Sequence, residues 1–155
     1  MAGIDVEVAV IAARQHSLVT LDQLIGLGGS RQLAHRRVNA GLWRRVEPGV
    51  YFDCGHPFTW EARVLAQVLA AGRGALASHR AGAVLWGVEG FRQGRPEISV
   101  HRHRKPEQLD ARVHESTDLH LADPVVIRRI PATGMVRTLL DVGSVISPAA
   151  NEQAI

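Results

Sequence analysis

Three stops divide the first fifty residues into short segments, and they limit the fold more than any other feature. Gly28-Gly29 ends one run of helical spacing, Gly41 ends the next, and Glu47-Pro48-Gly49 follows soon after. Glycine commonly ends helices because it tolerates left-handed backbone, and Pro-Gly suits a type II turn. The pattern therefore predicts short helices followed by a hairpin.

The segments between these stops carry helix and strand signals. Residues 4–15 have apolar side chains at helical spacing, Thr20 precedes a short helix over residues 21–27, and Ser30 precedes a third over residues 31–40. The strands LWRRV and VYF flank the Pro-Gly turn. Three helices and a hairpin in about fifty residues predict a winged helix-turn-helix DNA-binding domain over residues 1–54.

The rest of the chain mixes helices with strands, so the fold class is α+β. Residues 58–71 predict a helix, and Ser78 is positioned to cap another that ends at Gly87. PEISVHR, ARVHES and VVIRRI predict strands, and a helix from Gly134 to about Ile146 follows. We expect a mixed helix and strand domain over residues 58–155. The sequence ends inside a further helix that Pro148 would open, so we expect a truncated carboxyl terminus.

The third predicted helix has an unusual polar face. A helical wheel at about 100° per residue gathers five polar side chains on one side, and none of them is acidic. Arginine, glutamine and asparagine can form paired hydrogen bonds with base edges in the major groove. We therefore predict that this helix reads DNA through Arg31, Gln32, His35, Arg36 and Asn39.

Other basic side chains have different predicted roles. Arg37 falls on the core side of the wheel, where we expect it to reach a phosphate or to pair with Asp22 or Glu47. Arg44 and Arg45 alternate along the hairpin strand, so one can reach the DNA backbone while the other packs along the domain. Four residues of the second domain are further candidates for nucleic-acid or partner contacts: His79, Arg80, Arg102 and Arg104.

Catalytic and metal-binding patterns are weak. His101 and His103 could share a strand face, but no carboxylate at matching spacing completes a site, and arginines flank them. Ser78-His79 has no evident orienting carboxylate, and no glycine-rich phosphate loop occurs. We expect no catalytic residues, no metal and no cofactor, and therefore no enzyme.

Composition limits the compartment and the partners. The 155 residues carry a net charge of +3, and 17 of the 18 basic residues are arginine. Cys54 is the single cysteine, which excludes an internal disulfide. The amino terminus lacks a basic signal-peptide region, and no apolar run approaches the roughly 18 residues that span a bilayer. We expect a cytoplasmic protein with no membrane contact.

Three segments resemble the family of AbiEi-type antitoxins and related actinobacterial regulators. The first is the run from IAARQHS to RRVEPGVY, which resembles the family's winged helix. ALASHRAGAVLWGV and IPATGMVRTLLDV resemble two later segments, in the same order. Together the three matches span residues 11 to 142.

The resemblance implies a repressor that binds the promoter of its own toxin–antitoxin operon. It also implies a partner toxin resembling a nucleotidyltransferase, neutralised by the second domain. A sister group attaches a very-short-patch-repair-like endonuclease domain after these segments. Two alternatives therefore stay open: the targeting portion of a larger endonuclease, and a toxin-docking interaction module. The sequence leaves the oligomeric state open.

Overall fold

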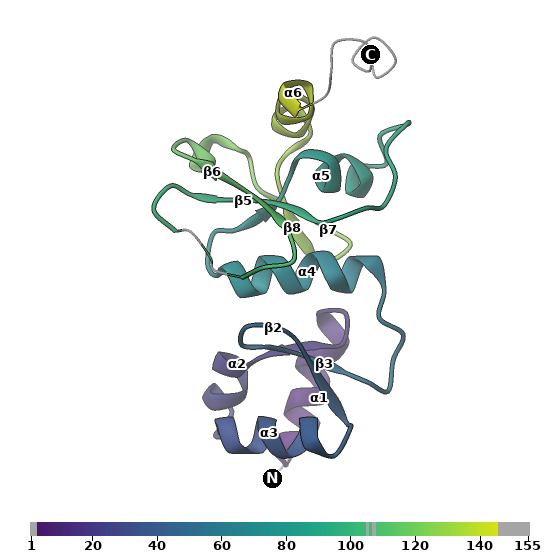
Figure 1. Ribbon diagram of the computed structural model, residues 1–155, viewed down its shortest axis with the longest axis vertical. Helices are drawn as coiled ribbons and strands as arrows, with labels where there is room; N and C mark the ends of the chain where they lie inside the picture. Colours follow the sequence, from purple (N-terminus) through teal and green to yellow (C-terminus); the bar gives the residue numbers. More distant parts are fainter. Residues whose placement is uncertain (1–2, 105, 107, 146–155) are drawn as a thin grey trace.

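The computed structural model describes residues 3–104, 106 and 108–145. Its elements form two units that follow one another along the chain (Figure 1). The amino-terminal unit holds three helices and a three-stranded sheet, and the second unit holds a five-stranded sheet with three helices. The α+β class, with a helical and hairpin unit ahead of a mixed sheet, is confirmed.

The helices of the first unit are α1 (Ile4–Arg14), α2 (Leu21–Gly26) and α3 (Arg31–Asn39). The Thr20 hydroxyl accepts a hydrogen bond from the backbone of Gln23, whose side chain accepts one from the Thr20 backbone in return. This capping box satisfies amide donors that a helix start otherwise leaves unpaired. These local signals place the predicted helices within one residue of their observed ends.

The sheet of the first unit contains one strand more than the predicted hairpin. Strands β2 (Trp43–Glu47) and β3 (Val50–Asp53) pair across the turn, where Gly49 has a φ of 69°. Strand β1 (Leu18–Thr20) pairs with the other edge of β3. Three residues are too few for a pattern of alternation to reveal a strand.

The second unit begins with α4 (Trp60–Ala71), which Thr59 caps, and continues through a mixed sheet. The sheet order is β6-β5-β4-β8-β7, with parallel pairs β5–β6 and β4–β8. A 3-10 turn over Leu119–Leu121 follows β6. The remaining elements are β4 (Leu76–Ala77), α5 (His79–Trp86), β5 (Glu97–His101), β6 (Arg112–Ser116), β7 (Val125–Ile127), β8 (Ile130–Ala132) and α6 (Met135–Val145).

The single strand predicted for VVIRRI is wrong. The segment forms a tight hairpin instead, in which β7 and β8 pair in antiparallel fashion. Arg128 and Arg129 form its turn with φ values of 49° and 65°. Both are left-handed, a conformation that Asn or Gly usually signals at this place, so the two arginines conceal the turn.

Helix α4 joins the two units. It lies between the hairpin and the second sheet in Figure 1, and one buried apolar cluster includes residues of both units. Leu18, Val50 and Phe52 come from the first sheet, and Leu65 and Ile98 are among those from the second unit. The predicted division between residues 54 and 58 therefore crosses a shared core, and residues 146–155 of the predicted second domain lie outside the described residues.

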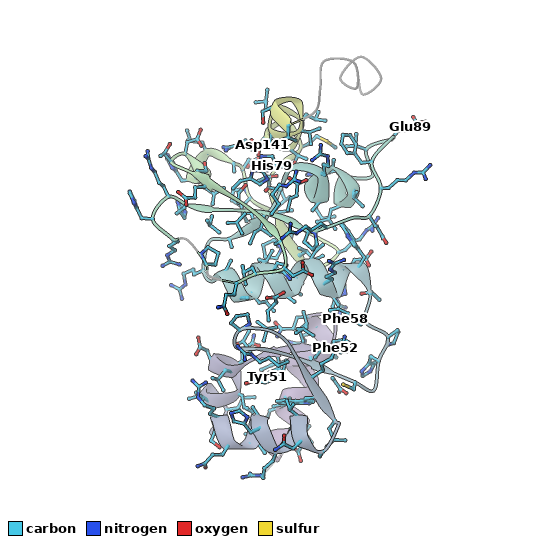
Figure 2. The ribbon with its side chains drawn as sticks, viewed as in Figure 1. Tyr51, Phe52, Phe58, His79, Glu89 and Asp141 are labelled. Carbon is cyan, nitrogen blue, oxygen red and sulfur yellow. The ribbon has the colours of Figure 1, made fainter. Side chains whose placement is uncertain are left out.

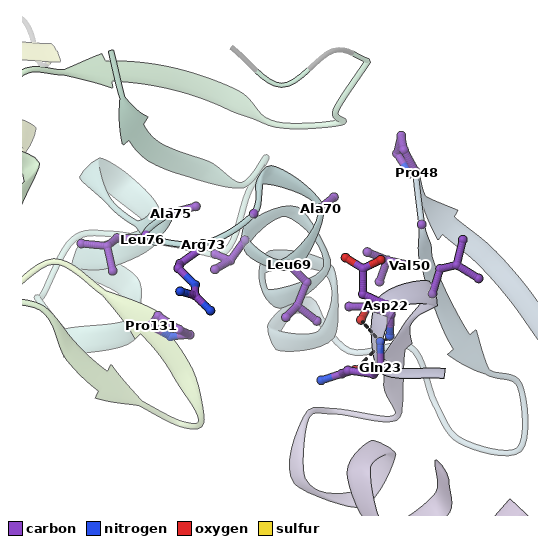
Figure 3. A pocket seen from close by; sticks show the side chains of 16 residues that line it. Asp22, Gln23, Pro48, Val50, Leu69, Ala70, Arg73, Ala75, Leu76 and Pro131 are labelled. Carbon is purple, nitrogen blue, oxygen red and sulfur yellow. Dashed lines mark hydrogen bonds between the residues drawn. The ribbon is translucent and has the colours of Figure 1, made fainter. Parts of the chain in front are cut away.

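A cleft of about 740 Å³ opens where the hairpin turn faces the end of α4. Figure 3 shows Pro48 and Val50 on one side and Leu69, Ala70 and Arg73 on the other. The hairpin turn thus lies against the second unit.

In the described part of the chain, every helix is too short or too polar to span a membrane.

Candidate nucleic-acid interface

The polar face of α3 is exposed as its periodicity predicts. Ala34 is fully buried against the first unit, and Leu33 and Val38 are partly buried beside it. The opposite side of the helix is exposed to solvent and consists of Arg31, Gln32, His35, Arg36 and Asn39. This face carries two arginines, a glutamine, a histidine and an asparagine, and no carboxylate.

The start of α3 adds a site for negative charge. Ser30 caps the helix, its hydroxyl accepting a hydrogen bond of 3.1 Å from the Leu33 amide. Helix starts attract phosphate groups through unpaired amides and the helix dipole. Among the described residues neither Arg31 nor Arg36 forms an ion pair, so no described acidic side chain neutralises them.

Arg37 has a partner that the sequence did not predict. Its guanidinium forms an ion pair with Asp5 on α1 and lies 4.7 Å from the centre of the Trp43 ring. The predicted partners Asp22 and Glu47 are therefore wrong, because the fold brings Asp5 at the start of α1 to Arg37 instead. Arg37 connects α3 to α1 and β2, on the side away from the exposed face.

Arg44 is the hairpin arginine that packs along the protein. Its guanidinium lies 4.8 Å from the ring centre of Phe58 and 5.8 Å from that of Phe52. Phe52 and Phe58 meet edge to face, and Figure 2 shows them side by side beneath α4. Arg45 is exposed and forms no ion pair within the described residues.

The turn of the hairpin is attached to the second unit. The Gln67 side-chain amide donates a hydrogen bond to the buried Glu47 carboxylate, which also accepts one of 3.3 Å from the Asp110 amide. A free wing tip would expose this turn to a DNA duplex. Here it faces α4, while Arg45 on β2 and the polar face of α3 stay exposed.

The candidate contacts in the second unit divide into buried and exposed residues. His79 is only 6% exposed, which leaves it almost no surface for a macromolecular partner. Arg80 forms an ion pair with Glu97. Arg102 and Arg104 are exposed, and Arg104 donates a hydrogen bond to the carbonyl of Arg73. His103 lies beyond the end of β5, so it does not share a strand face with His101.

Ser78 holds the capping position of α5 without capping it. Its hydroxyl instead bonds to Nδ1 of His79 at 2.9 Å and accepts a hydrogen bond of 2.7 Å from Ser99. The sequence also gave no sign that Glu97, His114 and Asp141 lie near His79. Two strands and a helix carry these three side chains, and only the parallel register of β5 and β6 brings the first two together.

The first unit is similar to a known protein family. Residues 8–51 match a family model described as "Transcriptional regulator, AbiEi antitoxin". The resemblance to AbiEi-type antitoxins is confirmed for this unit. The matched segment includes all of α3 and the whole hairpin turn, so the part of the chain that is similar to this family contains the exposed basic face. No curated protein matches the sequence.

A solved structure shares the fold over nearly the whole chain. The RV2827C protein from Mycobacterium tuberculosis aligns with a TM-score of 0.54 and 16% sequence identity. The alignment covers 93% of this chain and 62% of that protein. The likeness in fold therefore extends beyond residues 8–51, and the chain spans less than two thirds of the RV2827C protein.

Proposed function

We propose that this protein is a sequence-specific DNA-binding repressor of the AbiEi antitoxin type that acts on its own promoter. The exposed, acid-free face of α3 is the observation that carries the proposal. Five polar side chains with hydrogen-bond donors project from one short helix, and its capped start favours a phosphate. The match of residues 8–51 to a transcriptional regulator family supports the same reading.

In this proposal α3 enters the major groove, and its residues contact different bases. Arg36 and Arg31 suit guanine, and Gln32 and Asn39 suit adenine. Most contacts go to phosphates, which position the protein without reading sequence. Arg45, which is exposed on β2 next to this turn, makes a supporting contact with the DNA backbone. Because the turn is attached to α4, the second unit keeps a fixed orientation toward the duplex.

The antitoxin part of the proposal adds a protein partner. A toxin resembling a nucleotidyltransferase would bind the second unit while the first unit holds DNA. Co-expression of the neighbouring open reading frame with this chain, followed by co-purification, tests the partnership. A toxin complex that is insensitive to promoter DNA, formed by a chain that binds neither duplex at low salt, would instead support the interaction-module alternative, in which the basic face of α3 docks the toxin.

The DNA-binding proposal is tested by fluorescence anisotropy with the protein's own upstream promoter and a scrambled duplex. Measurements at two salt concentrations separate base reading from phosphate attraction, because phosphate-dominated affinity falls steeply with salt. We expect preference for the promoter at both concentrations. Arg36→Ala should reduce that preference by about 1–3 kcal/mol if it makes a bidentate base contact.

Arg92→Ala is the matched control, since Arg92 is exposed in a loop of the second unit. It should bind both duplexes as the unaltered protein does. Equal, salt-sensitive binding to promoter and scrambled DNA would contradict sequence-specific repression. That result would favour the alternative in which the chain targets an endonuclease domain to DNA.

A further inference from the structure

A buried polar cluster lies in the second unit, between the sheet and α6. Its members are His79 at the start of α5, Glu97 on β5 and His114 on β6. One potential ligand atom from each lies within 4.8 Å of the others. In Figure 2, His79 lies just beneath Asp141, which belongs to α6. The DNA-binding proposal uses none of these residues.

Hydrogen bonds and ring stacking hold the three side chains so that their potential metal-ligand atoms lie close together. Oε2 of Glu97 lies 2.8 Å from Nε2 of His114, while Arg80 donates to Oε1 at 3.2 Å. The imidazole rings of His79 and His114 stack with centres 3.5 Å apart. Because the Ser78 hydroxyl engages Nδ1 of His79, the second nitrogen of that ring is left for another partner.

The backbone at His79 is constrained. Its φ is 52°, in the left-handed region that side chains other than glycine rarely adopt. The residue sits where β4 passes into α5, so the unusual backbone turns its side chain inward beneath α6. Strained residues of this kind gather at ligand-binding and active sites, where the surrounding structure holds them in place.

Charge states in the cluster suit a cation. Burial, with help from neighbouring His114, lowers the pKa of His79 to about 4, so its imidazole is neutral near pH 7. Burial alone would raise the pKa of Glu97, but hydrogen bonds from His114 and Arg80 hold it below its ordinary value. Neutral imidazole and ionised carboxylate are the forms that bind metal ions.

An open cavity adjoins the cluster. It has a volume of about 500 Å³, and its walls include His79, His114, Ser99 and Asp141. One carboxylate oxygen of Asp141 is buried with no hydrogen-bond partner among the described residues, although Arg137 engages the other oxygen at 2.8 Å. A buried carboxylate oxygen without a donor is costly, so a hydrogen-bond donor inside the cavity would satisfy it.

We propose that His79, Glu97 and His114 form a binding site for a divalent transition-metal ion, with a water in the cavity as the fourth ligand. Two imidazoles and one carboxylate are a ligand set that zinc uses where one position stays open. Imidazole ligands favour zinc, nickel or copper over magnesium and calcium. The metal-bound water donates a hydrogen bond to the orphaned oxygen of Asp141.

Binding requires a small closure of the cluster. Ligand atoms around tetrahedral zinc lie about 3.4 Å apart when the bonds are about 2.1 Å long, against a spread of up to 4.8 Å here. His114 exchanges its hydrogen bond with Glu97 for the metal, and the two imidazole rings turn so that their lone pairs converge. Arg80 and Ser78 keep Glu97 and His79 oriented, as outer partners do in metal sites.

Isothermal titration calorimetry of untagged, chelator-treated protein with zinc chloride tests the site. We expect one zinc ion per chain, and a loss of at least about 100-fold in affinity for His114→Ala, since removing even an outer partner costs about 10–100-fold. The double variant His101→Ala, His103→Ala is the matched control, because both histidines are exposed and lie outside the cluster. It should bind zinc as the unaltered protein does.

A second measurement does not depend on the folding of a variant. Cobalt added to the unaltered protein should give the visible absorption of a low-coordinate ion, and an equimolar addition of zinc should abolish it. Binding that survives His114→Ala, binding that disappears in the double control, or a cobalt spectrum identical to that of the aqueous ion would each overturn the proposal. None of these three outcomes depends on whether the protein binds DNA, so the metal-site proposal and the DNA-binding proposal can fail separately.

Discussion

The side-chain amide of Gln67, in the middle of α4, donates a hydrogen bond to the carboxylate of Glu47, where β2 enters its turn. Both side chains are buried, at 2% and 7% exposure. The bond attaches the hairpin of the amino-terminal unit to the second unit. It therefore fixes how α3 is oriented with respect to the sheet that carries the proposed metal site.

Replacing Gln67 by methionine tests this attachment. The substitution keeps the shape but leaves the buried Glu47 carboxylate with the Asp110 amide as its remaining donor. Loss of a donor to a buried charged group costs about 1–3 kcal/mol, and removal of Oε1 of Gln67, which has no partner in the described part of the chain, offsets part of that. We expect Gln67→Met to lower the free energy of unfolding in urea by about 1–2 kcal/mol.

Gln93→Met is the control for that measurement, because Gln93 is exposed in a loop. Its stability should change by less than about 0.5 kcal/mol. If the two variants unfold at the same urea concentration, the Glu47 carboxylate does not depend on Gln67.

Arg44→Ala should lower stability without changing the choice of DNA sequence. Its guanidinium lies over the rings of Phe58 and Phe52, and an exposed contact of this kind contributes about 0.5–1 kcal/mol. Thermal unfolding measures the loss. An Arg44→Lys variant that recovered none of it would indicate that planar stacking matters more than charge.

Arg45→Ala should have the opposite profile. Arg45 is exposed and forms no ion pair among the described residues, so its removal should leave stability nearly unchanged. If it contacts a phosphate, affinity for promoter and scrambled duplexes should fall alike, and the slope of log affinity against log salt should shrink by about 1. An unchanged salt slope would place Arg45 outside the DNA contact.

The sequence predicted the parts of this fold that local chemistry determines. Thr20 and Ser30 cap the helices they precede, Pro48-Gly49 forms the expected turn, and the five polar residues of α3 share one exposed face. Each of these features depends on residues a few positions apart. Periodicity and capping could therefore reveal them without any knowledge of tertiary contacts.

Features that depend on distant segments were missed. Arg37 pairs with Asp5, 32 positions away, because the fold brings the start of α1 beside it. The His79 cluster joins a helix start to two strands whose pairing the sequence does not specify. The hairpin at Arg128-Arg129 was missed for a different reason, since its turn uses non-glycine residues with positive φ.

The pair of Arg37 and Asp5 should be weakly coupled. Asp5 keeps 74% of its side chain exposed, and solvent screens such pairs, so a double-mutant cycle with Arg37→Ala and Asp5→Ala should give about 0.2–1 kcal/mol of coupling. Arg37→Ala alone should cost more than Asp5→Ala, because it also loses the contact with Trp43. Equal effects of the two single variants would show that the Trp43 contact contributes nothing.

Gly82 on α5 should resist substitution although glycine is unfavourable inside a helix. A Cβ atom there would lie 3.1 Å from Cγ2 and 3.2 Å from Oγ1 of Thr138, on α6. Thr138 is fully buried, and its hydroxyl bonds to the Thr133 hydroxyl at 2.7 Å and to the Thr133 carbonyl at 3.1 Å. The threonine therefore has little room to move, and Gly82→Ala should destabilise the protein by about 1–2 kcal/mol.

Gly26→Ala is the matched comparison for Gly82→Ala. Gly26 also lies in a helix, and apart from its chain neighbours and its own helix backbone, no atom of the described residues lies within 4 Å of the position its Cβ would take. Alanine lowers the conformational entropy of the unfolded chain, so Gly26→Ala should raise the free energy of unfolding by up to about 1 kcal/mol. Urea unfolding of the two variants should thus shift in opposite directions. A stabilised Gly82→Ala would show that α5 and α6 are not in close contact at this point, and that α6, which covers His79, can move.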